Sequence, residues 1–549
     1  MKSKWIKMSI ISLIFIFLLI GIIFIDRNYL LTSQNSSSNK NITKNIEFYN
    51  NGEIYYVDKD EDTYIFTAKY QNTISQKIQD LLKDNEYNME NPLIINNPYV
   101  TNTLSLNIYF EEERKIDVKY TISAEGTKDF SKSLKYNDNN GYQIIGLVPG
   151  KTNNVLINYY EDGNEVGRKE FNIIVPELEH DIDAEFTFED GESNEEITDG
   201  LFALLGHDKS FSSNIYLYDN DGIIRSELVL DDYRGDRIIF KDDKMIYSNS
   251  TNSIIAVNNL GKIESFYSLG NYEMHHDYVY DEVNNKLLIL ANKLGSETIE
   301  DVVISLDLAT GDAKEVLDMR DLLGDMYEKA VMPKSGKNTY GGDELDWIHL
   351  NSLQVIDGKD IIVSARELST IIRVNNIYND PELKYLIADE SVYKDTEYEE
   401  YLYNKIGDFT ANAGQHTITY LKDDTLEEGK YYVYMFNNNY KGASTRPDFD
   451  WSNYVGCGTY SEGDKSMYYK YLVDENEGTY ELVDSFDVDY SSIVSSVEIL
   501  QDNYIVSSGM SHSYAEYDSE KNLIRKYKYN SKKYAYRVFK YIFDNFWFE

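Results

Sequence analysis

One structural unit recurs along the chain from about residue 200 to the C-terminal end. In each copy, a strand rich in aromatic or aliphatic residues ends in a polar turn and leads back. Asp or Asn followed closely by Gly is typical of hairpin turns, because Gly supplies the positive φ angles that these turns require. The clearest copies are 215–222, 254–261 and 302–311, and the weaker ones are 370–375, 470–478 and 513–521.

Six hairpins at spacings of roughly 40 to 60 residues predict the blades of a propeller, with about four strands in each blade. We therefore expect an all-β fold in which residues 181–549 form a six-bladed β-propeller. The repeats are weak, so five and seven blades are alternatives. A β-helix agrees less well, because its repeats are shorter and more regular. The 50 tyrosines also favour strands, since aromatic residues suit a pleated surface.

Residues 46–180 have the pattern of a smaller β-sandwich domain. Apolar residues alternate with polar ones over 104–110 and 118–122, which predicts strands with one buried face. Apolar residues at helical spacing over 74–82 predict one helix. We expect an Ig-like sandwich that ends near Pro176.

The N-terminus indicates the cellular compartment. Three lysines precede an apolar run over residues 8–25, which is long enough to cross a bilayer as a helix. No small-residue cleavage site follows it, so residues 1–25 predict an uncleaved single-pass anchor, with a cleaved secretion signal as the alternative. Residues 26–45 are polar and predict a flexible tether. Either way, we expect the remaining chain to be extracytoplasmic and, with the anchor retained, attached to the cell membrane.

Charge and cysteine content exclude several classes of protein. The chain has 53 basic and 94 acidic side chains and a net charge of −41. A general nucleic-acid binder is excluded, because nothing offsets phosphate repulsion. With Cys457 as its single cysteine, the chain has no intrachain disulfide and no multi-cysteine zinc site.

Three of the polar segments that contain histidine each lead into an apolar strand. The innermost strand of every propeller blade lines the central axis, so segments far apart in sequence converge there. We interpret this repeated position as a functional centre, whereas His180, His207 and His512 have the contexts of ordinary surface or core histidines. Asp346 and Trp347 are expected to orient or pack their blade. The three segments are Met274-His-His-Asp-Tyr278, Asp346-Trp-Ile-His-Leu-Asn-Ser352 and Gly414-Gln-His-Thr417.

These segments resemble the arylsulfate sulfotransferase family. The resemblance rests on DWIHLNS followed by SAR at 364–366, on GQHT followed by FNN, on the earlier HHD, and on a late blade at 468–483. It covers about residues 90–549. The resemblance implies a small β-sandwich followed by a six-bladed propeller, often in a homodimer. It also implies transfer of a sulfuryl group from a phenolic sulfate donor to a phenol acceptor without a nucleotide donor.

By the same resemblance, the histidine of GQHT, His416, corresponds to the nucleophile that becomes transiently sulfated. His349, Asn351 and Arg366 correspond to the groups that hold the sulfate. The residue types suit this chemistry: a neutral imidazole attacks an anionic sulfate more readily than a carboxylate does, and a guanidinium offers two donors to its oxygens.

One histidine of HHD corresponds to the group beside the phenol oxygen. We choose His276 because it directly precedes Asp277, although an alignment onto the H-x-N pattern at 349–351 favours His275. Thr417 lies beside the nucleophile as a hydrogen-bond donor. We therefore expect His416, His276, His349 and Arg366 to be catalytic and His275, Asn351 and Thr417 to bind substrate.

We expect neither a metal nor a cofactor. A histidine-ligated metal centre is one alternative, which Arg366 disfavours because a fixed cation repels a second one. A surface-anchored binding propeller without catalysis is the other, since fold alone does not decide function.

Overall fold

The computed structural model describes residues 46–138, 141–178, 185–206, 214–447, 449–459, 463–531 and 533–549. The predicted anchor (1–25) and tether (26–45) lie outside the described residues, as do His180 and His207. Within the described part, no helix has the length and apolar character needed to cross a membrane.

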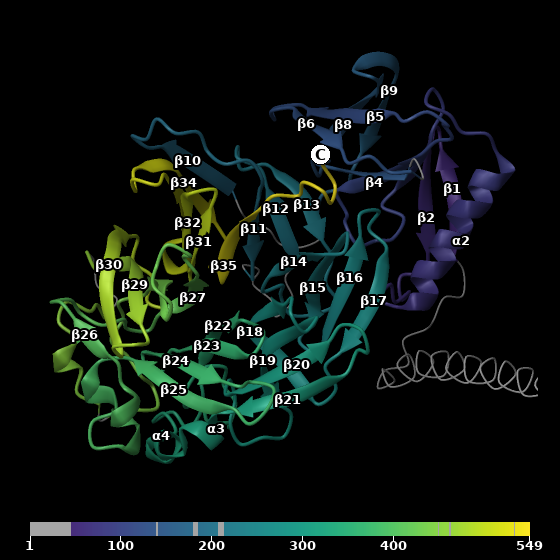
Figure 1. The fold of residues 1–549 in the computed structure, drawn as a ribbon. Helices are drawn as coiled ribbons and strands as arrows, with labels where there is room; N and C mark the ends of the chain where they lie inside the picture. The colour runs from purple at the N-terminus through teal and green to yellow at the C-terminus, as the bar shows by residue number, and fades with distance from the viewer. Residues whose placement is uncertain are drawn as a thin grey trace, which may run out of the picture.

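The N-terminal part consists of two sheets and one helix (Figure 1). One sheet has the order β1-β2-β3-β4-β7 and the other β6-β5-β8-β9. The predicted helix is present as α2 (Ala68–Asp84), which the side chain of Thr67 caps at its start and which buries Ile74 and Ile78. The strands are β1 (Ile46–Asn51), β2 (Ile54–Lys59), β3 (Leu93–Asn96), β4 (Ser105–Tyr109), β5 (Asp117–Ala124), β6 (Phe130–Leu134), β7 (Gly141–Ile145), β8 (Thr152–Glu161) and β9 (Asn164–Ile174).

Six antiparallel-paired sheets follow in the described residues, each with four or five strands. The first comprises β11 (Leu201–Leu205), β12 (Ile215–Tyr218), β13 (Ile224–Leu228) and β35 (Arg537–Tyr541). The second comprises β14 (Ile238–Lys241), β15 (Lys244–Ser250), β16 (Ser253–Asn258) and β17 (Ile263–Ser268). The third comprises β18 (Tyr272–Asp281), β19 (Lys286–Lys293), β20 (Val302–Asp307) and β21 (Ala313–Asp318).

The fourth sheet comprises β22 (Leu350–Ile356), β23 (Asp360–Ala365), β24 (Thr370–Asn375) and β25 (Glu382–Ile387). The fifth comprises β27 (His416–Leu421), β28 (Lys430–Asn437), β29 (Ser466–Asp474), β30 (Thr479–Val488) and a parallel edge strand, β26 (Asn404–Ile406). The sixth comprises β31 (Ser496–Leu500), β32 (Asn503–Ser508), β33 (Ser513–Tyr517), β34 (Leu523–Asn530) and β10 (Glu185–Asp190).

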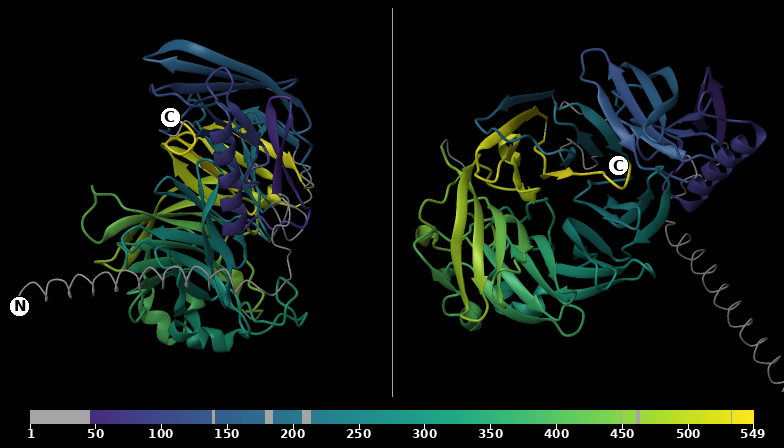
Figure 2. Two further views of the ribbon diagram at one scale, coloured as in Figure 1. Left: turned by 90° about the vertical axis from the view of Figure 1, so that its right-hand side faces the viewer. Right: turned by 45° about the horizontal axis from the view of Figure 1, so that its top comes forward.

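These sheets follow one another around a common centre, an arrangement that resembles propeller-type folds (Figures 1 and 2). Each of the six predicted hairpins lies in a different sheet, where it supplies the two strands that follow the buried inner pair. Both ends of the chain close the ring: β35 pairs with β11 of the first sheet, and β10 pairs with β34 of the last.

The described fold is mostly β. Besides α2, two short helices, α3 (Met319–Leu322) and α4 (Gly324–Lys329), follow the third sheet. The side chain of Asp318 accepts a hydrogen bond from the Arg320 amide and thereby caps α3. Capping of this kind is local, so it starts a helical turn that the strand pattern does not indicate.

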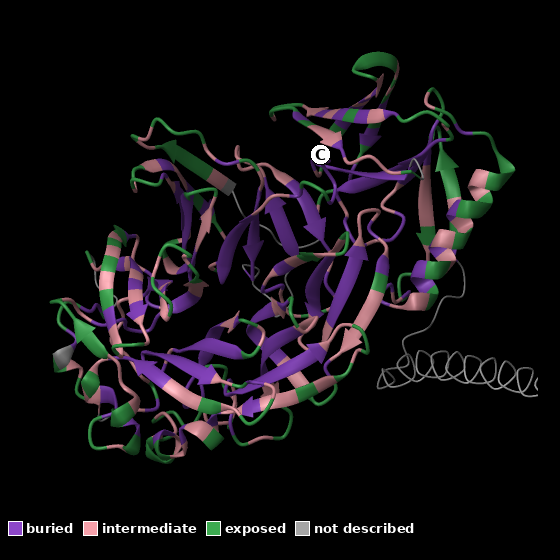
Figure 3. Cartoon of the chain, in the orientation of Figure 1, coloured by how far each residue is buried: buried purple, intermediate pink, exposed green. Residues whose placement is uncertain are grey.

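The inner strands are buried, whereas the outer face of α2 is exposed (Figure 3). The N-terminal part packs on the first two sheets, with which it shares one hydrophobic core. The Trp547 indole nitrogen donates to Gln143 at 2.9 Å, which joins the C-terminal end to the N-terminal sheet. Within the ring, the inner strand β22 contacts both β18 and β27.

Candidate active site

The three predicted histidine segments lie on the inner strands of three neighbouring sheets. They belong to β18, to the start of β22 and to the start of β27. The pairing register shifts at all three places, and His276, His349 and Thr417 have left-handed φ angles of 59°, 54° and 53°. A bulge in a strand re-aims side chains, so each segment departs from regular alternation where its histidine lies.

The rings of these segments meet around Tyr536, which directly precedes β35 in the first sheet. The His276 ring lies 4.9 Å from the His349 ring and 5.1 Å from the Tyr536 ring, centroid to centroid. The His416 ring lies 6.4 Å from the Tyr536 ring. Side chains from four sheets therefore converge on one place, and the sequence analysis did not identify Tyr536.

His416 has a defined tautomer. Its Nδ1 lies 3.0 Å from the Gly414 carbonyl oxygen and 2.7 Å from Oδ1 of Asn438. The amide nitrogen of Asn438 donates to the carbonyls of Ser491 and Val494, which fixes Oδ1 toward the imidazole. Because both partners of Nδ1 are acceptors, Nδ1 carries the proton and Nε2 keeps a free lone pair. Burial, and then the positive charge of Arg366, lowers the pKa of His416 well below its usual value.

His349 is in the opposite electrostatic environment. Its Nδ1 lies 2.6 Å from a carboxylate oxygen of Glu300 and 2.7 Å from one of Asp346. Burial alone would lower its pKa, but the two carboxylates outweigh burial and raise the pKa to about 10. His349 is therefore a charged donor at neutral pH. Asp346 contacts His349 directly, whereas Trp347 packs and donates to Asp301 at 2.9 Å.

The rings of His275 and His276 meet edge to face, with their Nδ1 atoms 2.8 Å apart. Burial is the main cause that lowers the pKa of both, to about 3 for His275 and well below the usual value for His276. The structure brings the His276 ring against His349 and Tyr536, whereas His275 lies behind it, against His276. Nε2 of His275 is buried and has no hydrogen-bond partner among the described residues.

Arg366 follows β23 and is anchored at its backbone and its side chain. Its amide donates to the carbonyl of His349 at 3.1 Å, and Nη1 donates to Oε1 of Glu367 at 3.0 Å. Glu367 is buried and also accepts hydrogen bonds from Ser444 and from both the amide and hydroxyl of Thr445. These bonds fix the backbone of Arg366 beside His349 and one nitrogen of its guanidinium beside Glu367. The other guanidinium N–H groups are suited to bind an anion.

Asn351 and Thr417 are also placed at the centre. The amide nitrogen of Asn351 donates to the carbonyl of Gln415 at 2.8 Å, which ties β22 to the residue before His416. The hydroxyl of Thr417 donates to the carbonyl of Ser495 at 3.0 Å. The expectation that Thr417 donates to substrate does not agree with this geometry, because its single proton is already used.

Asp277 does not support His276 in the way that motivated our choice of that histidine. Its carboxylate accepts from Arg537 at 2.8 Å and from Arg237 at 3.0 Å. Arg537 also donates to the carbonyl of Asn351 at 2.8 Å. These contacts join residues of four neighbouring sheets, since Arg237 directly precedes β14 of the second sheet.

A further cation, Arg234, lies beside these rings and was missing from the sequence analysis. Its guanidinium carbon lies 3.9 Å from the Tyr536 ring centroid, and its Nε donates to the buried Asp236 at 2.8 Å. Its charge contributes to the low pKa of His275 and His276. No motif marks it, since the segment before β14 carries no histidine.

Some histidines and carboxylates at the centre lie close enough together to hold a metal ion. In the described residues, two groups of three have ligand atoms within 4.8 Å of one another: His275 with His276 and Glu300, and Glu300 with Asp346 and His349. The charged imidazole of His349 already supplies a cation to the second group.

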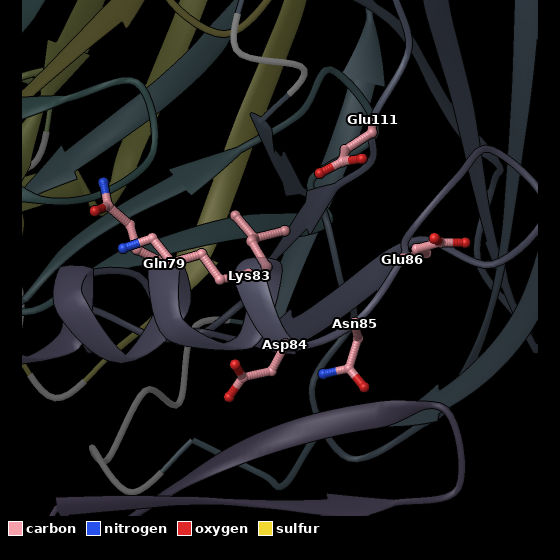
Figure 4. A pocket seen from close by; sticks show the side chains of 7 residues that line it. Gln79, Lys83, Asp84, Asn85, Glu86 and Glu111 are labelled. Carbon is pink, nitrogen blue, oxygen red and sulfur yellow. The ribbon is translucent and has the colours of Figure 1, made fainter.

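A surface pocket of about 540 Å³ lies elsewhere, at the C-terminal end of α2 (Figure 4). Asp84, Glu86 and Glu111 line it with a single Lys83. Its excess of carboxylates disfavours an anionic ligand, so we do not place the functional site there.

Two family models match the chain. A model of the arylsulfotransferase (ASST) family matches residues 189–540, and a model of the arylsulfotransferase Ig-like domain matches residues 93–176. No curated protein sequence matches the chain.

Solved structures give only distant likenesses. An auxiliary nutrient binding protein from Bacteroides thetaiotaomicron is 9% identical, with a TM-score of 0.32 over 77% of this chain and 94% of that one. A streptogramin B lyase is 10% identical, with a TM-score of 0.29 over 63% of this chain and 98% of that one. At these TM-scores the likenesses carry no argument about function.

Proposed function

The chain belongs to the arylsulfotransferase family, whose model covers more than half of its residues, and it is therefore a sulfotransferase. From this premise we propose that it moves a sulfuryl group from a phenolic sulfate ester to an acceptor phenol, by a ping-pong mechanism through a sulfated His416. The observation that carries the proposal is the fixed tautomer of His416, whose Nδ1 faces two acceptors and whose Nε2 is free to attack.

In the first half-reaction, the lone pair on Nε2 of His416 attacks the sulfur of the donor. An N–S bond forms, the bond from sulfur to the phenol oxygen breaks, and its electron pair leaves on the phenolate. The guanidinium of Arg366 and the charged imidazole of His349 face the oxygens on which negative charge grows, with Asn351 beside them. Such donors act without reorganisation because carboxylates already hold them in place.

In the second half-reaction, the acceptor phenol attacks the same sulfur. His276, whose pKa is lowered by burial, is neutral and accepts the phenol proton as the new S–O bond forms. The N–S bond breaks and its electron pair returns to Nε2 of His416. His276 then releases this proton to solvent, from which the donor phenolate has taken one, so both His276 and the proton balance are restored.

The remaining predictions complete the proposal. We infer that the six sheets are the blades of a six-bladed propeller, since both chain ends close the ring by pairing with another sheet. We also propose that residues 1–25 anchor the enzyme in the cell membrane with its catalytic part outside. This proposal rests on the apolar run and the preceding lysines. A homodimer stays a prediction from the family resemblance.

Mass spectrometry tests the covalent step. Protein mixed with an aryl sulfate and no acceptor should gain about 80 Da, the mass of SO3, on the peptide that carries His416. The variant His416→Asn should fold normally, lose the adduct and lose transfer to phenols. An adduct on His276 or His349, or wild-type transfer in the variant, would contradict the assignment.

One observation favours a second function, a histidine-ligated metal centre: the closeness of Glu300, Asp346 and His349. Prolonged treatment with a chelator separates the two. Retained transfer supports the metal-free mechanism, whereas activity lost on treatment and restored by one divalent metal would support the metalloenzyme.

A further inference from the structure

We propose that Glu300 is a positioning residue: together with Asp346 it holds His349 as a charged donor, and the charge of His349 in turn keeps the adjacent His276 neutral. The proposal rests on the proposed function, because it assigns how that reaction divides its roles between two histidines. No motif in the sequence marks Glu300, and no family match assigns it a role.

Glu300 is fixed between two sheets by its own backbone. It lies between β19 and β20 of the third sheet, is 2% exposed and has a left-handed φ of 60°. Its amide donates to the side chain of Asn292 at 2.7 Å, and its carbonyl accepts from the Leu350 amide at 2.9 Å. A left-handed conformation is uncommon for such a residue, and it persists here because both backbone groups are held.

The carboxylate of Glu300 reaches both histidines, at unequal distances. One oxygen lies 2.6 Å from Nδ1 of His349, and the other lies 3.4 Å from Nδ1 of His276. Asp346 adds a second carboxylate to the same nitrogen of His349 at 2.7 Å. The proton on Nδ1 of His349 bonds to Asp346, and the negative charges of both carboxylates stabilise a second proton on Nε2. His349 is therefore a cation that presents Nε2–H to a ligand.

His276 has the contrary surroundings. Its nearest polar partner is Nδ1 of His275 at 2.8 Å, and the charges of His349 and Arg234 both oppose a second positive charge there. The Glu300 oxygen 3.4 Å from Nδ1 of His276 favours a proton on that nitrogen, which leaves Nε2 as an acceptor. The pKa values agree with this division: that of His349 is raised to about 10, whereas burial lowers that of His276.

Other titratable groups also lie around His349. Arg366 follows β23, His416 begins β27, and the loop residue Tyr340 extends toward Glu300 and Asp346. None of them is a carboxylate, so among the groups around His349, Glu300 and Asp346 supply the negative charge. Two titratable groups whose surroundings separate their pKa values are the usual arrangement for an acid and a base in one site.

The division of roles predicts a specific pH dependence. His349 stays charged, and transfer stays active, until the pH rises through the raised pKa of His349. In Glu300→Gln the amide keeps the size of the side chain but removes its charge, so the alkaline limb of kcat/KM should move down by about one to three pH units. Glu300→Asp keeps the charge and should recover part of that shift. Glu297→Gln, an exposed change of the same kind on the same loop, should leave the profile unchanged.

Two measurements on the full chain test the role of Glu300. Transfer from an aryl sulfate to a phenol is followed from pH 6 to pH 11, and ¹⁵N-labelled histidine spectra give the titration of His349 without any turnover. An unshifted alkaline limb in folded Glu300→Gln, or a His349 that titrates near its ordinary value in the wild type, overturns the proposal. If the wild type transfers no sulfuryl group, the proposed function fails, while the spectra still test Glu300 independently.

Discussion

Replacement of Arg366 is the most direct test of how the site stabilises charge. In the structure its Nη1 is used by Glu367 at 3.0 Å, and its side chain is 13% exposed. The variant Arg366→Gln removes the charge and the planar fork while keeping a polar side chain of smaller size. Arg366→Lys keeps the charge and removes the fork.

The structure indicates that the fold tolerates these variants. Glu367 loses its ionic partner in Arg366→Gln, but it still accepts from Ser444 and from two groups of Thr445. Its buried charge therefore keeps three hydrogen bonds, and the loop that donates them stays attached. The effect should appear in catalysis rather than in stability.

Removing one preorganised donor costs about 2.7–4 kcal/mol of transition-state stabilisation, which is a loss of roughly 100- to 1000-fold in rate. The lysine variant retains the attraction between unit charges but loses bidentate geometry, so we expect an intermediate loss of about 10- to 100-fold. Because the interaction grows as the phenolate leaves, kcat should fall along with kcat/KM.

The assay is release of a coloured phenol from an aryl sulfate, in steady state and in a single turnover without acceptor. Arg525→Gln is the matched control, since Arg525 pairs with Asp190 at the outer edge of the sixth sheet. Two results would refute the reasoning. One is a glutamine variant within threefold of the wild type. The other is a change in KM alone, which would make Arg366 a general anchor for anions.

Two further predictions concern stability and location. Asp277→Asn leaves the buried Arg537 and the half-buried Arg237 without their shared carboxylate and should destabilise the fold by about 3–5 kcal/mol, measured by thermal melting against the exposed control Asp243→Asn. A melting temperature equal to that of the wild type would contradict this. Burial alone would raise the pKa of Asp277 but the two arginines lower it, so its contribution is present at neutral pH and is lost as the pH falls through that lowered value. The full chain should sediment with membranes and a chain starting at Asn45 should remain soluble and active; a full chain that stays in the supernatant would contradict the anchor.

The repeating part of the fold could be predicted from turn chemistry. Asp or Asn near Gly marks a hairpin wherever it occurs, so the six copies identify one hairpin in each of the six sheets. The closure of the ring could not be predicted in this way. β35 pairs with β11 more than 300 residues away, and neither strand carries a turn signal that connects it to the other. Pairing over that distance is determined by packing of the whole ring, which a local pattern does not contain.

The site likewise contains residues that a local sequence signal indicates and residues that no such signal indicates. His416, His349 and Arg366 were found because their segments repeat relative to a strand and match a family pattern. Asn438 is the last residue of the FNN segment, so a signal for it existed, although its role became clear only from its contact with Nδ1 of His416. Glu300 had no signal at all. It approaches His349 across the boundary between two sheets, and its backbone is fixed by contacts with both.

The positively charged side chains at the centre are paired with carboxylates. Arg366 is paired with Glu367, Arg234 with Asp236, and the cation at His349 faces two carboxylates. These pairs cancel most of the local positive charge, and the whole chain carries a net charge of −41, so long-range attraction does not bring an anionic substrate to the site. Binding depends instead on short-range donors held in fixed directions by their carboxylate partners. The carboxylates at the centre therefore serve the reaction by orienting donors, even though their own charge opposes the sulfate.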